Sequence, residues 1–247
     1  MSEALTMSAR SLRVSRRQID ALLTSLMLPV LLLLMFVELF GGAIHTGTKY
    51  VTYVVPGLLV LCAGFSSGLT AVAVCQDMTG GIVDRLRAMD VRGTSVLAGH
   101  VAASVARNLC SGVLVIGVAV LLGFRPHAGV PGWLAAVGIL LAFVLAVSWL
   151  SAALGLLARS PEAANGATFL IMFLPYASSA FVPVHTMPAW LHGFAAHQPI
   201  TPVTETLRRL LLGAPVGSEA WIALAWCGGI LFCSLALSRV LFGRRTG

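Results

Sequence analysis

The chain has 247 residues, of which 58% are hydrophobic and only 10% are charged, and its mean hydropathy is +0.93. This composition excludes a water-soluble domain and predicts a protein that lies largely within a membrane. The formal net charge of +7 comes from cations that flank apolar runs, so anionic lipid headgroups, and not nucleic acid, are the expected partners.

Six apolar runs fill the sequence, at 21–42, 54–75, 96–124, 132–157, 166–184 and 219–242. A helix of about 20 residues, at ~1.5 Å rise per residue, covers the ~30 Å hydrocarbon core of a bilayer. We therefore expect an all-α polytopic protein with six transmembrane helices, forming one domain over residues 1–247 without a fused soluble module. The first run is too long for a cleaved signal peptide, and Pro175 interrupts the fifth, which is the shortest.

The basic residues favour one orientation. With the N-terminus in the cytoplasm, twelve of the sixteen lysines and arginines fall inside, and the positive-inside rule then predicts that both termini are cytoplasmic. The inside set is Arg10, Arg13, Arg16, Arg17, Arg85, Arg87, Arg92, Arg107, Arg159, Arg239, Arg244 and Arg245, and the outside set is Lys49, Arg125, Arg208 and Arg209.

The N-terminal residues 1–20 predict an amphipathic helix at the inner membrane surface. Leu5, Ala9, Leu12 and Ile19 share one face at helical spacing, and the opposite side is basic. The alternative is a simple orienting cluster of arginines. The basic residues of this interface helix are Arg10, Arg13, Arg16 and Arg17.

Glu38 lies near the outer end of the first run. An ionisable residue within a span is a functional candidate for contact with substrate or protons, but the depth of Glu38 favours an interfacial position. Its carboxylate would then reach the headgroup layer.

Residues 64–68 match the G-x-S-x-G pattern of serine hydrolases. They lie in the middle of an apolar run with no preceding strand, and no histidine–acid pair accompanies them. Small residues at such a position more often let two membrane helices approach closely, so we reject a hydrolase and predict a packing role.

The loop at 76–95 carries more charge than a simple connection requires. Gly80 and Gly81 end one helix, and Gly93 ends the next. Between these glycines, apolar residues share one helical face and charged residues lie away from it. This pattern predicts a short helix that docks on another protein, the alternative being a solvated loop. Its candidate contact residues are Asp77, Ile82, Asp84, Arg85, Leu86, Arg87, Met89, Asp90 and Arg92.

Residues 185–215, before the last run, predict two short helices at the outer interface or dipping into the membrane. Thr201 is the expected N-cap of the second helix, and Gly213 is its expected stop. Trp190 is the expected interfacial anchor.

The sequence lacks the motifs for ATP hydrolysis, zinc binding and paired-cysteine chemistry. The single lysine, Lys49, follows Thr48 outside any phosphate-binding loop, so the energy for any transport must come from a partner or an ion gradient. There is no zinc motif, and the five cysteines occur without a CxxC pair. We predict buried thiols and no metal.

Three segments carry a resemblance to a known family: Phe181 to Gly213, Val83 to Arg87 with Val96 to Gly99, and Tyr53 to Leu58. Over most of its length the chain resembles the membrane subunits of type 2 ABC exporters, especially the daunorubicin-resistance branch. The sequence departs from the usual pattern of that branch at Asp90, near which relatives carry a proline, and at His100, near which they carry an arginine.

The resemblance implies a multi-pass half-transporter of the cytoplasmic membrane. Two such subunits, expected to be identical, would rest on two copies of a separate ATP-binding subunit, which would hold ATP and Mg. The helix at 82–91 would be the coupling helix, and the exported substrates would be amphipathic drugs such as anthracyclines. The candidate substrate path is Glu38, Phe65, Ser66, Ser67, Tyr176 and Phe181, and the candidate outer gate is Trp190, Glu205, Arg208 and Arg209.

Three alternatives remain open at this stage. Related branches export lipids or polysaccharides. A proton-driven secondary transporter would need several intramembrane acids and an inverted repeat, whereas the sequence displays only Glu38 and no repeat. The third alternative is a membrane scaffold without transport activity.

Overall fold

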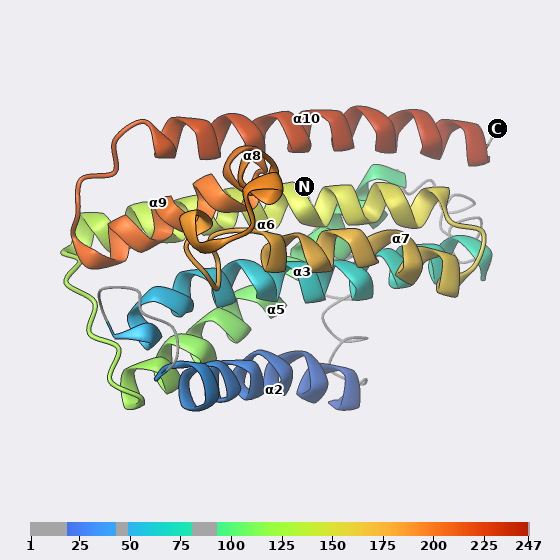
Figure 1. Cartoon of the computed structure of the whole chain (residues 1–247). Helices are drawn as coiled ribbons and strands as arrows, with labels where there is room; N and C mark the ends of the chain where they lie inside the picture. Colours follow the sequence, from blue (N-terminus) through green and yellow to red (C-terminus); the bar gives the residue numbers. More distant parts are fainter. Residues whose placement is uncertain (1–18, 43–48, 81–92, 247) are drawn as a thin grey trace.

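The computed structural model describes residues 19–42, 49–80 and 93–246 (Figure 1), and every regular element in these ranges is helical. The all-α prediction is therefore confirmed for this part of the chain. The elements are α2 (Ile19–Met35), η1 (Phe36–Phe40), α3 (Tyr50–Thr79), α5 (Gly93–Leu121), α6 (Val130–Leu157), α7 (Pro161–Phe173), η2 (Leu174–Ala177), η3 (Val184–Thr186), α8 (Ala189–His197), α9 (Ile200–Leu212) and α10 (Glu219–Thr246).

Four helices in the described ranges are long and apolar enough to cross a membrane. They are α3, Ser95–Leu121 of α5, α6, and Glu219–Phe242 of α10, and they match the second, third, fourth and sixth predicted runs. The first run is a shorter apolar helix, Met27–Phe40, in which α2 continues into the π-helix η1.

The fifth run, predicted at 166–184 with an interruption at Pro175, is not one continuous α-helix. Ser160 caps α7 by accepting a hydrogen bond from the amide of Ala163 at 3.2 Å, and Pro161 occupies the first turn. The helix ends at Phe173 and becomes the short 3-10 helix η2, which contains Pro175. The structure confirms the interruption predicted at Pro175, where proline lacks the N–H that would continue the α-helical ladder.

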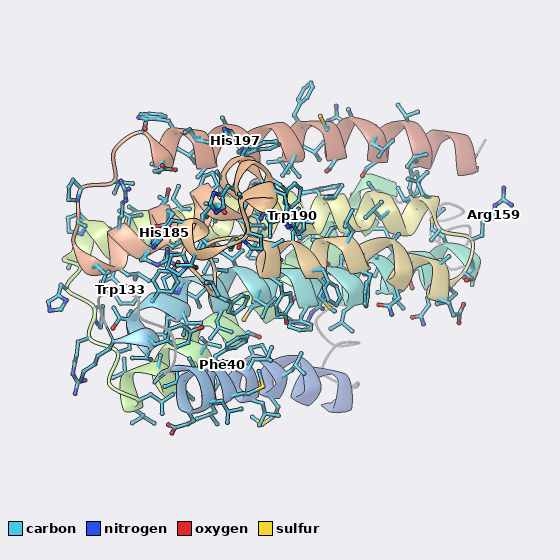
Figure 2. The ribbon with its side chains drawn as sticks, viewed as in Figure 1. Phe40, Trp133, Arg159, His185, Trp190 and His197 are labelled. Atoms are coloured by element: carbon cyan, nitrogen blue, oxygen red, sulfur yellow. The ribbon has the colours of Figure 1, made fainter. Side chains whose placement is uncertain are left out.

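Helix α3 occupies the centre of the bundle. It packs against α2, α5, α6, α7 and α9, whereas α2 and α10 lie at opposite edges in Figure 1. Glycine on a neighbouring helix permits close contact, since a Cβ at Gly155 of α6 would clash with the carbonyl oxygen of Ala71. We name the two ends of the bundle after α3: the Tyr50 end and the Thr79 end. Figure 2 shows Trp133 at the Tyr50 end and Arg159 at the Thr79 end.

The G-x-S-x-G residues have the predicted packing role. A Cβ at Gly64 would touch Met172 of α7 at 3.4 Å, and one at Gly68 would lie 3.2 Å from Asn165 on the same helix. The Ser67 hydroxyl is buried and donates to the carbonyl of Gly64 at 2.5 Å. These residues form the contact surface between α3 and α7.

The helices at 185–215 do not lie beyond the end of the bundle. Figure 1 shows α9 running alongside the long helices, and it packs on α3, α6 and α10. Gly213 ends α9 in the left-handed conformation with φ 69°, as predicted. Thr201 is not the N-cap: Pro199 occupies that position, and the Thr201 hydroxyl instead donates to the carbonyl of Ala195 at 2.5 Å.

Candidate functional site

A buried cation joins three parts of the chain at the Tyr50 end. Arg208 of α9 is only 7% exposed, and its Nε donates to the carbonyl of Tyr53 at 3.2 Å. Its Nη2 donates to the same carbonyl at 3.1 Å and to the carbonyl of Ser179 at 2.8 Å, while Nη1 pairs with Glu205. The guanidinium also lies 3.7 Å from the centroid of the Tyr53 ring. We call Arg208, Glu205, Tyr53 and Ser179 the Arg208 tie.

The tie fixes residues 178–181, which follow η2. The Tyr53 hydroxyl donates to the carbonyl of Ser179 at 2.9 Å, and the Tyr50 hydroxyl donates to that of Phe181 at 3.1 Å. From the other side, the amide of Ser179 donates to the Thr201 hydroxyl at 3.2 Å. A Cβ at Gly57 would clash with the carbonyl oxygen of Ala180, so α3 touches this segment backbone to backbone. Residues 178–181 are therefore held between α3 and α9.

An open cavity of about 570 Å³ lies beside the tie. Its walls come from α3, α8, α9 and the start of α10, and its polar residues include Tyr53, His185, His192, Glu205 and Glu219. Figure 2 shows His185, Trp190 and His197 around α8, where Trp190 is 81% exposed. Two carboxylates, those of Glu205 and Glu219, line the cavity, and the cavity opens at the surface.

A row of aromatic rings runs from α7 to η1. Phe169 and Phe173 are neighbours with centroids 4.4 Å apart, Phe173 meets Tyr176 at 5.6 Å, and Tyr176 stacks on Phe181 at 5.2 Å. Phe181 stacks in turn on Phe36 at 4.5 Å, which lies 5.6 Å from Phe40. We call these six residues the aromatic row. Phe181 at its centre is buried, while Phe169, Phe173, Tyr176 and Phe40 are exposed.

The predicted substrate-path residues separate into two groups. Tyr176 and Phe181 lie in the aromatic row, whereas Ser66 and Ser67 are buried in α3. Glu38 is exposed on η1, within the same turn region as Phe36 and Phe40. Phe65 is half-buried and packs against the core around α3. The structure does not bring these six residues to one surface.

The predicted outer-gate residues also take different positions. Glu205 and Arg208 belong to the tie, Trp190 projects outwards from α8, and Arg209 donates to the carbonyl of Val216 at 3.4 Å. Of these four residues, Arg208 is the buried one. Arg208 shares the buried face of α9 with Val203, Leu207 and Leu211, where hydrogen bonds compensate the loss of water.

Two polar contacts join α3 and α5. At the Thr79 end, Asp77 of α3 and His100 of α5 lie 3.1 Å apart, so Asp77 belongs to a helix and not to the following loop. Nearer the middle, Arg107 donates to the Thr70 hydroxyl at 3.2 Å. The Ser148 hydroxyl of α6 donates to that of Ser104 at 2.9 Å. These contacts link α3, α5 and α6 through polar side chains inside the bundle.

The remaining predicted contacts lie outside the described residues. These are the basic residues of the N-terminal helix, Arg10, Arg13, Arg16 and Arg17, and the loop residues Ile82, Asp84, Arg85, Leu86, Arg87, Met89, Asp90 and Arg92. Within the described ranges, no group of three or more histidine, cysteine or acidic side chains is arranged to hold a metal ion.

Sequence reasoning missed Tyr53 and Ser179 in the tie, and Phe36, Phe40, Phe169 and Phe173 in the aromatic row. The row had a signal, because Phe36–Phe40 and Phe169–Phe173 are i,i+4 pairs on their helices. In the tie only Glu205 and Arg208 had a signal, as an i,i+3 pair, since the other acceptors are backbone carbonyls of residues distant in sequence.

The long apolar helices, the interrupted fifth segment and the short helices beside α10 define a multi-pass membrane protein. The ABC-2 type transporter family model matches residues 2–212, and the chain belongs to this family. It is therefore an integral protein of the cell membrane, and membership implies association with an ABC ATP-binding subunit.

Two similar proteins cover nearly the whole chain. The daunorubicin resistance ABC transporter permease protein DrrB1 of Streptomyces coeruleorubidus is 29% identical over 244 residues, which are 98% of this chain and 86% of that protein. The probable doxorubicin resistance ABC transporter permease protein DrrC of Mycobacterium tuberculosis (strain H37Rv) is 23% identical over 241 residues, covering 96% and 87% of the two chains. Both relatives are membrane subunits and not enzymes.

Proposed function

We propose that the chain is the membrane subunit of an ATP-driven exporter of amphipathic aromatic drugs of the anthracycline class. The observation that carries this proposal is the match over 98% of the chain to a daunorubicin-resistance permease. The aromatic row supports the substrate class, because its exposed rings offer faces on which a flat aromatic molecule stacks.

The proposed topology has six crossings with both termini in the cytoplasm. Four described spans, together with α2–η1 and α7–η2, supply the six crossings, and the chain forms one transmembrane domain. Arg159 and the three arginines in residues 81–92 favour the cytoplasmic side for the Thr79 end. The Tyr50 end, with the Arg208 tie and the open cavity, is then the outer side.

The proposed assembly pairs two copies of this chain on two copies of an ATP-binding subunit. ATP and Mg bind to that partner, and this chain supplies the path. Residues 81–92 and the N-terminal arginines provide the contacts with the ATPase. Nucleotide binding moves these contacts, and the paired membrane subunits alternate between inward-open and outward-open states.

Reconstitution with the partner tests this function. The chain and its ATP-binding subunit are placed together in vesicles, and the uptake of a fluorescent anthracycline and of a labelled phospholipid are compared. We expect ATP-dependent uptake of the anthracycline. Movement of the lipid without movement of the drug would reject the proposed substrate class. Uptake of drug and lipid that continues in the absence of ATP would reject an ATP-driven exporter.

A further inference from the structure

Arg208 places a positive charge on the buried face of an amphipathic helix. Leu207 and Leu211, on either side of it along α9, are each 1% exposed. A guanidinium in apolar surroundings is strongly unfavourable unless its donors are paired. Here all three nitrogens donate: Nε and Nη2 to backbone carbonyls, and Nη1 to Glu205. Each of the three guanidinium nitrogens therefore has at least one acceptor within the protein.

These acceptors belong to different parts of the chain. Tyr53 lies in the first turn of α3, Ser179 lies in the segment after η2, and Glu205 is one turn earlier on α9. The planar fork of arginine reaches several acceptors at once in a fixed geometry, which a single ammonium group does not. The contact is consequently a rigid joint between α9, residues 178–181 and α3.

Helix α3 leads from this joint to the opposite end of the bundle. It is a single helix of 30 residues, so it spans about 45 Å at the usual rise of ~1.5 Å per residue. Its last residue, Thr79, directly precedes the segment that carries the proposed ATPase contacts. The turn beyond Tyr53 is also fixed to residues 178–181, because Gly57 touches Ala180.

We propose that Arg208 is a positioning residue that joins α9, on which α8 packs, and residues 178–181 to α3, so that a displacement of α3 during the nucleotide cycle reaches the outer side. The inference rests on the proposed function, since it requires a separate ATPase that moves the Thr79 end of α3. The residue touches neither nucleotide nor substrate. Arg208 determines whether a displacement at the Thr79 end of α3 opens the outer side at the Tyr50 end.

The neighbouring residue provides a matched control. Arg209 has the same charge and lies on the same helix, but it donates to the carbonyl of Val216 in the connection to α10. Arg208→Gln and Arg209→Gln therefore remove the same charge from adjacent positions. Arg208→Lys keeps the charge and removes the fork.

The first experiment measures drug transport and ATP hydrolysis in the same vesicles, which contain the full chain and its ATP-binding subunit. We expect Arg208→Gln to reduce the drug transported per ATP hydrolysed on the order of tenfold, within the usual range of coupling between sites, and Arg209→Gln to leave it unchanged. Arg208→Lys should fall between them. Equal transport per ATP in Arg208→Gln and the wild type would overturn the proposal.

The second experiment is insensitive to the amount of folded protein. Hydrogen exchange of the α8 and α9 amides is measured with and without ATP. In the wild type the nucleotide should change exchange in α8 and α9, and in Arg208→Gln this response should disappear while the response at the Thr79 end of α3 persists. A simple loss of stability would alter exchange equally with and without ATP. Persistence of the nucleotide response in α8 and α9 would overturn the proposal.

A milder variant serves if Arg208→Gln does not accumulate. Tyr53→Phe removes one hydrogen bond to Ser179 and keeps the carbonyl that Arg208 contacts, so the nucleotide response of α8 and α9 should be reduced roughly two- to fivefold. An undiminished response in that variant would overturn the proposal. Failure of the proposed function is distinguishable, because it would be seen in the wild type, as a complex that hydrolyses ATP without moving any drug.

Discussion

Residues 178–181 belong to two regions that are held by different forces. At Ser179, the carbonyl accepts from Tyr53 and Arg208 and the amide donates to Thr201, all with directional hydrogen bonds. Two residues later, the side chain of Phe181 is held by ring stacking on Phe36 and Tyr176. Hydrogen bonds fix a position, whereas stacked rings tolerate sliding and accept another flat ring in place of one of their own.

The Arg208 tie and the aromatic row therefore suit different roles. Every residue of the Arg208 tie except Glu205 is buried, and the tie suits the transmission of motion. The aromatic row is exposed at several rings and suits contact with a substrate that varies in detail. We therefore expect substitutions in the tie to reduce stability or coupling, and substitutions in the row to reduce substrate affinity.

The largest effect is expected where α3 meets residues 178–181. Gly57→Ala would place a methyl group against the carbonyl of Ala180, in a contact made by two backbones. Overpacking of this kind destabilises a protein by about 1–3 kcal/mol. We expect a lower midpoint of thermal unfolding in detergent for the purified chain.

Gly138→Ala in α6 is the matched control for that substitution, because a Cβ there has no neighbour within 4 Å. Alanine in an unobstructed helix position should leave the midpoint unchanged or raise it. Equal midpoints for Gly57→Ala and Gly138→Ala would contradict the close contact between α3 and Ala180.

A smaller effect is expected at the hydroxyl of Tyr53. Tyr53→Phe leaves the carbonyl of Ser179 without one buried donor, which should reduce stability by about 1 kcal/mol. Tyr176→Phe keeps a ring that is 40% exposed in the aromatic row and should change the unfolding midpoint little. A larger shift for Tyr176→Phe than for Tyr53→Phe would reverse the comparison between the two regions.

The sequence predicted the helices better than it predicted these contacts. Apolar length identified α3, α5, α6 and α10, and a glycine after an apolar stripe located the end of α9. Pro175 also predicted the interruption of the fifth run, because its missing N–H prevents a continuous helix at 166–184. The contacts of Arg208 could not be predicted, because charge alone does not reveal that backbone carbonyls from elsewhere in the chain surround it.

In the aromatic row, substrate affinity should change more than stability. Phe173 is 45% exposed, so Phe173→Leu removes a ring without opening a large cavity. Loss of one aromatic contact is worth about 0.5–1.5 kcal/mol, and we expect KM for an anthracycline to rise while basal ATP hydrolysis stays constant.

Phe232→Leu on α10 is the control, since this ring is 75% exposed and lies outside the row. Both variants exchange an exposed phenylalanine for leucine on an apolar helix. An equal rise of KM in the two variants would show that the row has no specific part in substrate contact.

The smallest effect is expected at Glu38, beside the row on η1. Its carboxylate is exposed, where a pair of charges contributes roughly 0–1 kcal/mol. If the carboxylate contacts a cationic substrate, Glu38→Gln should raise KM for cationic anthracyclines and leave KM for a neutral analogue unchanged. Unchanged values for every cationic substrate would end this hypothesis and place Glu38 at the headgroup layer.

The most direct test of the account concerns the source of the energy. Anthracycline accumulation is measured in inverted membrane vesicles that contain the chain and its ATP-binding subunit, with ATP, without ATP, and with ATP plus an uncoupler that collapses the proton gradient. The account predicts accumulation that requires ATP and survives the uncoupler. Accumulation that an imposed proton gradient drives in the absence of ATP would contradict it.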